Sequence, residues 1–95
     1  MDRAAFEAKL KAEGYGEIVE RVFDAGKTTP EHTHPFDAHA LILEGEITVT
    51  WAGGSTTCKP GETFSLNAGV PHFEIYGPQG TKALVGRRMK ASAAA

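Results

Sequence analysis

The sequence predicts a small all-β domain, an antiparallel sandwich or barrel with one short N-terminal helix. Two observations carry this prediction. After residue 16, Gly and Pro recur so often that only segments of strand length fit between them. Several of these segments alternate apolar and polar residues, as half-buried strands do. A chain of 95 residues supports one hydrophobic core and is too short for two, so we expect a single domain over residues 1–95.

The helix is expected within residues 1–16. Phe6 and Leu10 lie four positions apart among Ala, Lys and Glu, which is the spacing of an amphipathic helix. The "GYG" at 14–16 ends it. We expect the helix to cover one face of the sheet.

The β-barrel is expected over residues 17–88. Alternation is clearest in "ITVTW", where Ile47, Val49 and Trp51 share one face. Residues 89–95 are low in complexity and are expected to form a flexible tail. We expect strands at 17–25, 31–34, 38–44, 46–51, 55–59, 62–66, 72–76 and 81–88.

Composition argues against several function classes. The formal net charge is −2 and the Lys and Arg residues are scattered, so we expect no nucleic-acid partner. The longest apolar run, 40–43, is too short to span a membrane, and the N-terminus carries charges where a signal peptide needs an apolar core. The single cysteine, Cys58, cannot form an internal disulfide, which agrees with a reducing compartment. We expect a cytoplasmic protein with no membrane partner.

Three of the four histidines lie within residues 31–39. On a strand, His32 and His34 point in the same direction, since their positions differ by two. A neutral imidazole is the commonest metal ligand in proteins, and two ligands alone hold a metal weakly. His72 follows the turn at 67–71, and a barrel can bring it opposite His32, so we expect it to supply a third ligand.

Two stretches resemble the motifs of the cupin superfamily. The first family motif is Gly, five residues, His-x-His, three or four residues, Glu, six residues, Gly. This chain has Gly26, His32-Thr33-His34 and Gly45. The second family motif is matched by Gly61, Gly69 and His72, with fifteen residues between the two motifs. The resemblance covers residues 26–76 and implies a small antiparallel double-stranded β-helix, the cupin jelly-roll barrel.

The family's metal-binding Glu has no carboxylate counterpart here. Counting forward from His34 leads to His39, whereas counting backward from Gly45 leads to Ala38. If Ala38 faces inward, Asp37 or water completes a shell of three imidazoles. Strand alternation forbids both 38 and 39 from facing inward unless a bulge intervenes. We favour His39, because the region is crowded by Pro35. The expected metal ligands are then His32, His34, His39 and His72.

The expected cofactor is a divalent transition metal, since a nitrogen-rich shell suits iron, manganese, nickel, copper or zinc. The resemblance implies a metal-dependent enzyme, similar to the family's dioxygenases and isomerases, acting on a small polar organic molecule. No general acid or base is assigned, and the nearby carboxylates are Glu31, Asp37 and Glu44. The alternatives are a non-catalytic module that binds or senses a small ligand or metal, and a barrel whose histidines bind no metal. Exposed edge strands favour a homodimer.

Overall fold

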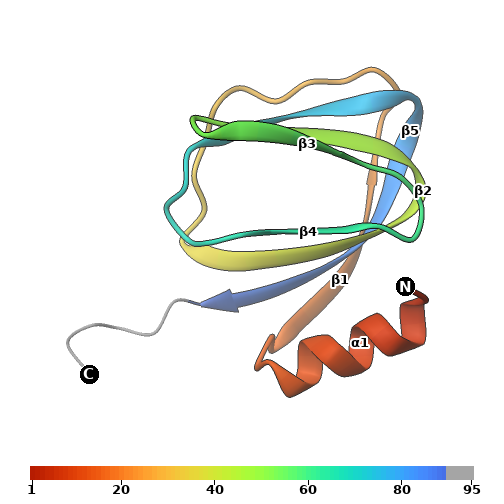
Figure 1. The fold of residues 1–95 in the computed structure, drawn as a ribbon, viewed down its shortest axis with the longest axis vertical. Coiled ribbons are helices and arrows are strands. Elements are labelled where there is room, and N and C mark those ends of the chain that lie inside the picture. The colour runs from red at the N-terminus through yellow and green to blue at the C-terminus, as the bar shows by residue number, and fades with distance from the viewer. Residues whose placement is uncertain (90–95) are drawn as a thin grey trace.

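The structure is a computed structural model that describes residues 1–89 (Figure 1). The order of elements is α1 (Arg3–Ala12), β1 (Glu17–Phe23), β2 (Phe36–Trp51), β3 (Gly54–Cys58), β4 (Thr63–Leu66) and β5 (His72–Met89). The strand pairs are antiparallel. This arrangement confirms the all-β class with a short N-terminal helix. Beyond Met89, the expected tail lies outside the described residues. No helix in the described part of the chain is long and apolar enough to cross a membrane.

The two longest strands, β2 and β5, organise the barrel. They pair with each other over most of their length, and β5 also pairs with β1. The first half of β2 pairs with β4 and its second half with β3. The register of β2 against β5 shifts between Ile42 and Glu44 and again between Gly45 and Ile47. Such irregularities bend a strand, and here the pair curves back on itself to enclose an interior (Figure 1).

The expected break at Gly45 is wrong, because the predicted strands 38–44 and 46–51 form one continuous strand. Gly45 has φ +74°, and a Cβ there would lie 1.9 Å from the carbonyl oxygen of Gly80. Only glycine tolerates both this backbone conformation and this close approach of β5. The glycine therefore bends β2 without ending it. In the same way, the predicted strands 72–76 and 81–88 merge into β5.

The predicted strand at 31–34 is also wrong. This segment belongs to the connection between β1 and β2, and its sheet pairing is reduced to an isolated bridge between His32 and His72. The bridge nevertheless fixes the segment, because His32 N donates to His72 O at 2.9 Å and His72 N donates to His32 O at 3.0 Å.

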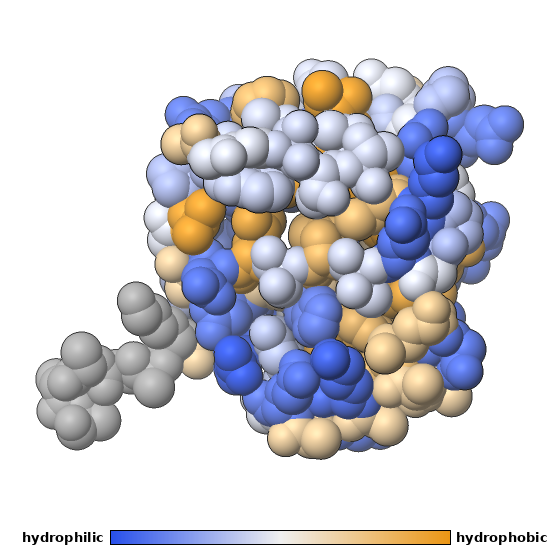
Figure 2. All heavy atoms as spheres, viewed as in Figure 1, coloured by the Kyte–Doolittle hydropathy of each residue, from blue (hydrophilic) through white to orange (hydrophobic). Residues whose placement is uncertain are grey.

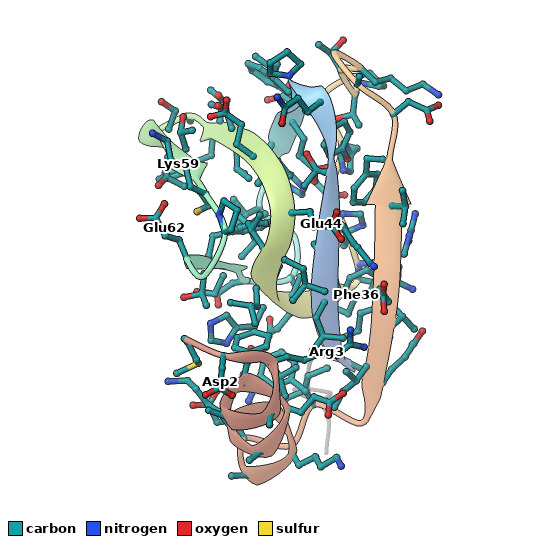
Figure 3. All side chains as sticks on the ribbon, turned by 90° about the vertical axis from the view of Figure 1, so that its right-hand side faces the viewer. Asp2, Arg3, Phe36, Glu44, Lys59 and Glu62 are labelled. Atoms are coloured by element: carbon teal, nitrogen blue, oxygen red, sulfur yellow. The ribbon has the colours of Figure 1, made fainter. Side chains whose placement is uncertain are left out.

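Capping at both ends defines α1, and Asp2 lies at the N-terminal end (Figure 3). The Asp2 side chain accepts a hydrogen bond from Ala5 N at 2.9 Å, which is an N-cap. At the other end Tyr15 N donates to Leu10 O at 2.9 Å, and Gly14 has φ +81°. These are features of a Schellman motif. Phe6 and Leu10 are fully buried beneath the barrel, as their spacing predicts.

The register shifts in β2 also change which residues face the interior. Before them, Ala38 and Ala40 line the interior cavity, whereas Leu41 packs under α1. After them, Ile47 and Val49 belong to the interior core. The inward face thus changes from even to odd positions, which decides the orientation of the residues near the candidate site.

Candidate metal centre

Three imidazoles converge inside the barrel, in the wall of its cavity. The ring centroids of His32 and His72 are 4.4 Å apart, those of His32 and His34 are 4.8 Å apart, and those of His34 and His72 are 5.1 Å apart. His72 is the most deeply placed, with 1% of its side chain exposed. The convergence expected from two distant segments of the sequence is therefore present in the fold.

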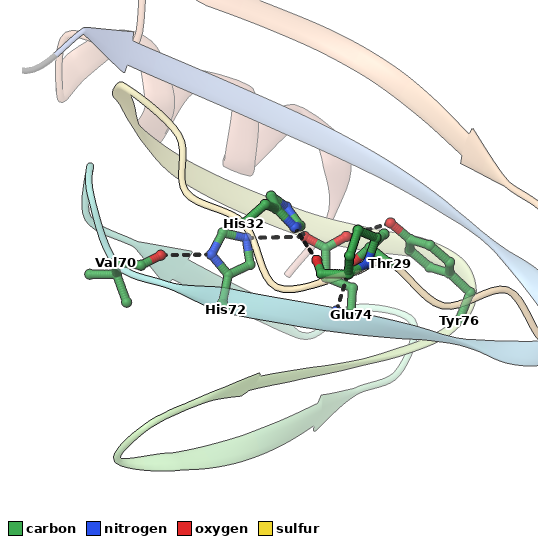
Figure 4. A network of polar contacts seen from close by, with 7 residues as sticks. Thr29, His32, Val70, His72, Glu74 and Tyr76 are labelled. Carbon is green, nitrogen blue, oxygen red and sulfur yellow. Dashed lines mark hydrogen bonds and ion pairs between the residues drawn. The ribbon is translucent and has the colours of Figure 1, made fainter.

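Backbone carbonyls occupy the outer nitrogens of two rings, and Figure 4 shows the pair of His72 and Val70. His32 Nδ1 lies 2.7 Å from Pro30 O, and His72 Nδ1 lies 2.9 Å from Val70 O. Because a carbonyl oxygen only accepts, Nδ1 carries the hydrogen in both rings. In the neutral form each Nε2 then presents a lone pair, which is what a metal ligand needs.

Glu74 completes the cluster. Its Oε1 lies 3.4 Å from His72 Nε2 and 3.9 Å from His32 Nε2. Its Oε2 accepts a hydrogen bond from the Tyr76 hydroxyl, and its backbone N–H donates to Thr29 Oγ1 at 3.0 Å (Figure 4). These contacts hold the carboxylate toward the imidazoles.

The donor atoms fit a metal ion. One atom from each of His32, His34, His72 and Glu74 can be chosen so that all four lie within 4.8 Å of one another. His72 Nε2 is buried and makes no hydrogen bond among the described residues. Because the hydrogen is on Nδ1, the lone pair of Nε2 faces the Glu74 carboxylate. A cation shared by these two groups would stabilise this arrangement. Three imidazoles and one carboxylate are a common donor set for zinc, iron and their neighbours.

His34 is electrostatically matched to this role. Burial lowers its pKa below the usual imidazole value, and the neighbouring His32 and His72 lower it further. The neutral form that binds metal is thereby favoured at neutral pH. The ring also stacks on Phe36, with centroids 4.7 Å apart, so its orientation is fixed by packing.

His39 does not join the cluster, and its expected place among the ligands is corrected by the fold. Its ring packs edge-on against Phe6, with centroids 5.0 Å apart, and near Tyr15. It lies under α1, on the opposite face of β2 from Ala38, which lines the cavity. The backward count from Gly45, which leads to Ala38, is the one that matches the fold. Burial lowers the pKa of His39.

The carboxylates considered from the sequence lie elsewhere. Asp37 accepts hydrogen bonds from Ala68 N at 2.8 Å and from Arg88 Nη2 at 3.1 Å. Glu31 and Glu44 are exposed. Sequence reasoning overlooked Glu74, although a signal was present: His72 and Glu74 are two apart on one strand and so share a face.

The cluster forms part of the wall of a cavity of about 380 Å³. Much of the remaining wall is apolar and includes Phe64, Leu66 and Val85. In the view of Figure 2 the surface is hollowed between β3 and β4, and hydrophobic atoms are visible inside the hollow. The volume lies at the lower end of the range of about 300–1,000 Å³ that is typical of small-molecule sites.

Comparisons with known proteins identify the fold. A family model described as "Cupin domain" matches residues 19–75. A Rhizobium leguminosarum protein of unknown function superposes with a TM-score of 0.73 at 20% identity, over 77% of this chain and 69% of that one. An RmlC-like cupin from Shewanella frigidimarina gives a TM-score of 0.66 at 22% identity, over 82% of this chain and 69% of that one. At these identities the similarity concerns the fold.

A further similar structure carries an enzyme's name. The DMSP lyase DddQ from Ruegeria pomeroyi superposes with a TM-score of 0.65 at 27% identity. The match covers 80% of this chain and 38% of that protein. A comparison with curated protein sequences finds no match.

Proposed function

The chain belongs to the cupin domain family, and from this premise we propose that it is a metal-dependent enzyme acting on a small polar organic molecule. The observation that carries the proposal is the buried lone pair of His72 Nε2, grouped with donor atoms of His32, His34 and Glu74. These four residues would hold the ion. A divalent ion bound there supplies a Lewis acid, or a redox centre if it is iron, manganese or copper.

The chain's own residues prepare the site for chemistry. The carbonyls of Pro30 and Val70 fix two imidazoles in one tautomer, which keeps Nε2 available. Tyr76 holds one oxygen of Glu74 and leaves the other for the ion. The apolar walls reduce the number of water molecules near a bound substrate, which strengthens electrostatic interactions in the cavity. The name of the similar DMSP lyase supports enzymatic chemistry on this fold.

A non-catalytic binding module is the second candidate, and one observation favours it. Outside the metal cluster, the titratable groups among the described lining residues are Arg21, Lys27, Tyr76 and Arg87. Burial and Glu74 raise the pKa of Tyr76 still further from neutrality. Guanidinium and ammonium groups and a phenol exchange protons poorly at neutral pH, so any proton transfer falls to the cluster itself or to the substrate.

One experiment separates the two candidates. The protein is purified without a histidine tag, its bound metals are quantified by mass spectrometry, and it is reconstituted with iron, manganese, nickel, copper or zinc. Oxygen uptake and substrate conversion are then followed over a panel of small organic acids. Stoichiometric metal with turnover supports the enzyme, whereas tight ligand binding without turnover supports the binding module. Failure to bind any of the five metals stoichiometrically contradicts both metal-dependent versions.

A further inference from the structure

A second buried nitrogen in the cavity wall makes no hydrogen bond. Among the described residues, the buried side-chain nitrogens without a hydrogen-bond partner are His72 Nε2 and Arg87 Nε. Both residues line the same cavity. A buried polar atom left without a partner costs free energy, whether it is the lone pair of His72 Nε2 or the N–H of Arg87 Nε, so both atoms point to a ligand that the cavity receives. The metal accounts for His72 and leaves Arg87 unexplained.

The contacts that Arg87 makes within the chain hold its guanidinium in place without using Nε. Nη1 donates to Glu17 Oε1 at 3.3 Å, and 57% of that acid's side chain is exposed. The guanidinium also lies 5.0 Å from the centroid of the Phe36 ring. An exposed ion pair of this kind contributes little to stability, and Phe36 offers no acceptor in the plane of the guanidinium. Nε is therefore left without an acceptor among the described residues.

Arg87 lies close to the metal cluster. The Phe36 ring that contacts its guanidinium also stacks on His34, with ring centroids 4.7 Å apart. A small molecule bound beside Arg87 would therefore lie next to the imidazoles.

The charges on the cavity wall have one predominant sign. Arg21, Lys27 and Arg87 are cationic, and among the described lining residues Glu74 is the only acid. Glu74 is already engaged by Tyr76 and faces the imidazoles. A bound divalent ion would make the cavity more positive still. The rest of the wall is largely apolar, so the lining suits an anionic group attached to an apolar body.

We propose that Arg87 is the anion-binding residue of this cavity and that the ligand is a small monocarboxylate with an apolar body. This inference rests on the proposed function, since it names the class of substrate for the same site. A guanidinium binds a carboxylate through charge-assisted hydrogen bonds in a fixed geometry, and Nε is one of its donors. The carboxylate would provide the acceptor that Nε lacks, and the apolar body would lie against Phe64, Leu66 and Val85.

The test compares benzoate with its neutral analogue benzamide as probes of the zinc-reconstituted protein. Affinities are measured by isothermal titration calorimetry for the wild type and for Arg87→Gln, Arg87→Lys and Lys82→Gln. Lys82→Gln is the matched control, because this substitution removes one positive charge from the same strand. Lys82 pairs with Glu20 outside the cavity. Zinc content and thermal unfolding are recorded for every variant.

We expect the wild type to bind benzoate at least about tenfold more tightly than benzamide, the difference of a charge-assisted hydrogen bond. Arg87→Gln should reduce that preference the most, Arg87→Lys should retain more of it, and Lys82→Gln should retain all of it. Equal affinities for the two probes in the wild type would overturn the inference without any variant. An unchanged preference in a folded Arg87→Gln protein would also overturn it.

The same data distinguish this inference from the proposed function. If the wild type fails to bind zinc but still prefers benzoate through Arg87, the metal proposal fails and the carboxylate site stands. If zinc binds stoichiometrically and the preference for benzoate is missing, the metal proposal stands and the assignment of Arg87 fails.

Discussion

Replacing Glu74 by Gln tests how the metal cluster is built. The substitution removes the negative charge beside His72 Nε2, 3.4 Å away, while the shape of the side chain is preserved. An amide oxygen can still accept the hydrogen bond from Tyr76. The variant should therefore fold, and its defect should lie in metal binding.

The expected size of the effect follows from the loss of one charged ligand. Removing even an outer partner of a metal site costs about 10–100-fold in affinity, so we expect about a hundredfold for Glu74→Gln. At a metal concentration of about 100 times the wild-type Kd, bound metal stabilises the wild type by about 2.7 kcal/mol. For a chain of 95 residues this raises Tm by about 11–22 °C. The variant, at a concentration near its Kd, should gain only about 0.4 kcal/mol.

Thermal unfolding with and without zinc measures this difference. Glu44→Gln is the matched control, because it removes a carboxylate that is exposed and lies 3.4 Å from Lys82 Nζ, away from the cavity. The control should show the full zinc-dependent shift. A folded Glu74→Gln protein with the wild-type shift would refute the assignment of Glu74 as a ligand and leave a cluster of three imidazoles.

Three further predictions concern stability and assembly. In urea denaturation, Gly45→Ala should lower the free energy of unfolding by about 3 kcal/mol or more, because Gly45 has a left-handed backbone and an added Cβ would clash with Gly80. The control Gly16→Ala should have little effect, because the space around Gly16 is open. Burial lowers the pKa of His39 in the folded state, so as pH falls His39 takes up a proton in the unfolded chain before it does so in the folded protein. The free energy of unfolding should therefore decrease as pH drops below about 6.5, until the lower folded-state pKa has been passed. His39→Phe should weaken that dependence in urea titrations at several pH values, and an unchanged dependence would contradict it. The edges presented by β1 and β3 predict a homodimer, which a monomer mass of 10.1 kDa by light scattering at micromolar concentration would disprove.

The sequence was most informative where spacing alone fixes direction. His32 and His34 are two apart, and His72 follows a turn between antiparallel strands, so we expected the three to meet inside the barrel. They do meet, although the segment of His32 and His34 is held by an isolated bridge to His72 and is not a strand. The buried pair Phe6 and Leu10 was predictable for the same reason, because helical spacing places both on one face.

The errors arose where register depends on the path of the backbone. Whether Ala38 or His39 faces inward depends on the register shifts in β2, which the glycine at 45 permits but does not specify. His39 also has an alternative environment under α1, which only the packing of Phe6 reveals. We sought the metal-binding carboxylate next to the histidine-rich segment. The fold provides it from β5, as Glu74, two residues after His72 on the same strand.

Anomalous diffraction at the absorption edge of the reconstituted metal tests the central claim most directly. We predict one peak per chain, at about 2.0–2.2 Å from Nε2 of His32 and His72, from a ring nitrogen of His34 and from an oxygen of Glu74. A crystal of stoichiometrically loaded protein whose peak lies elsewhere, or whose ion is bound by His39, would contradict this assignment of the metal centre.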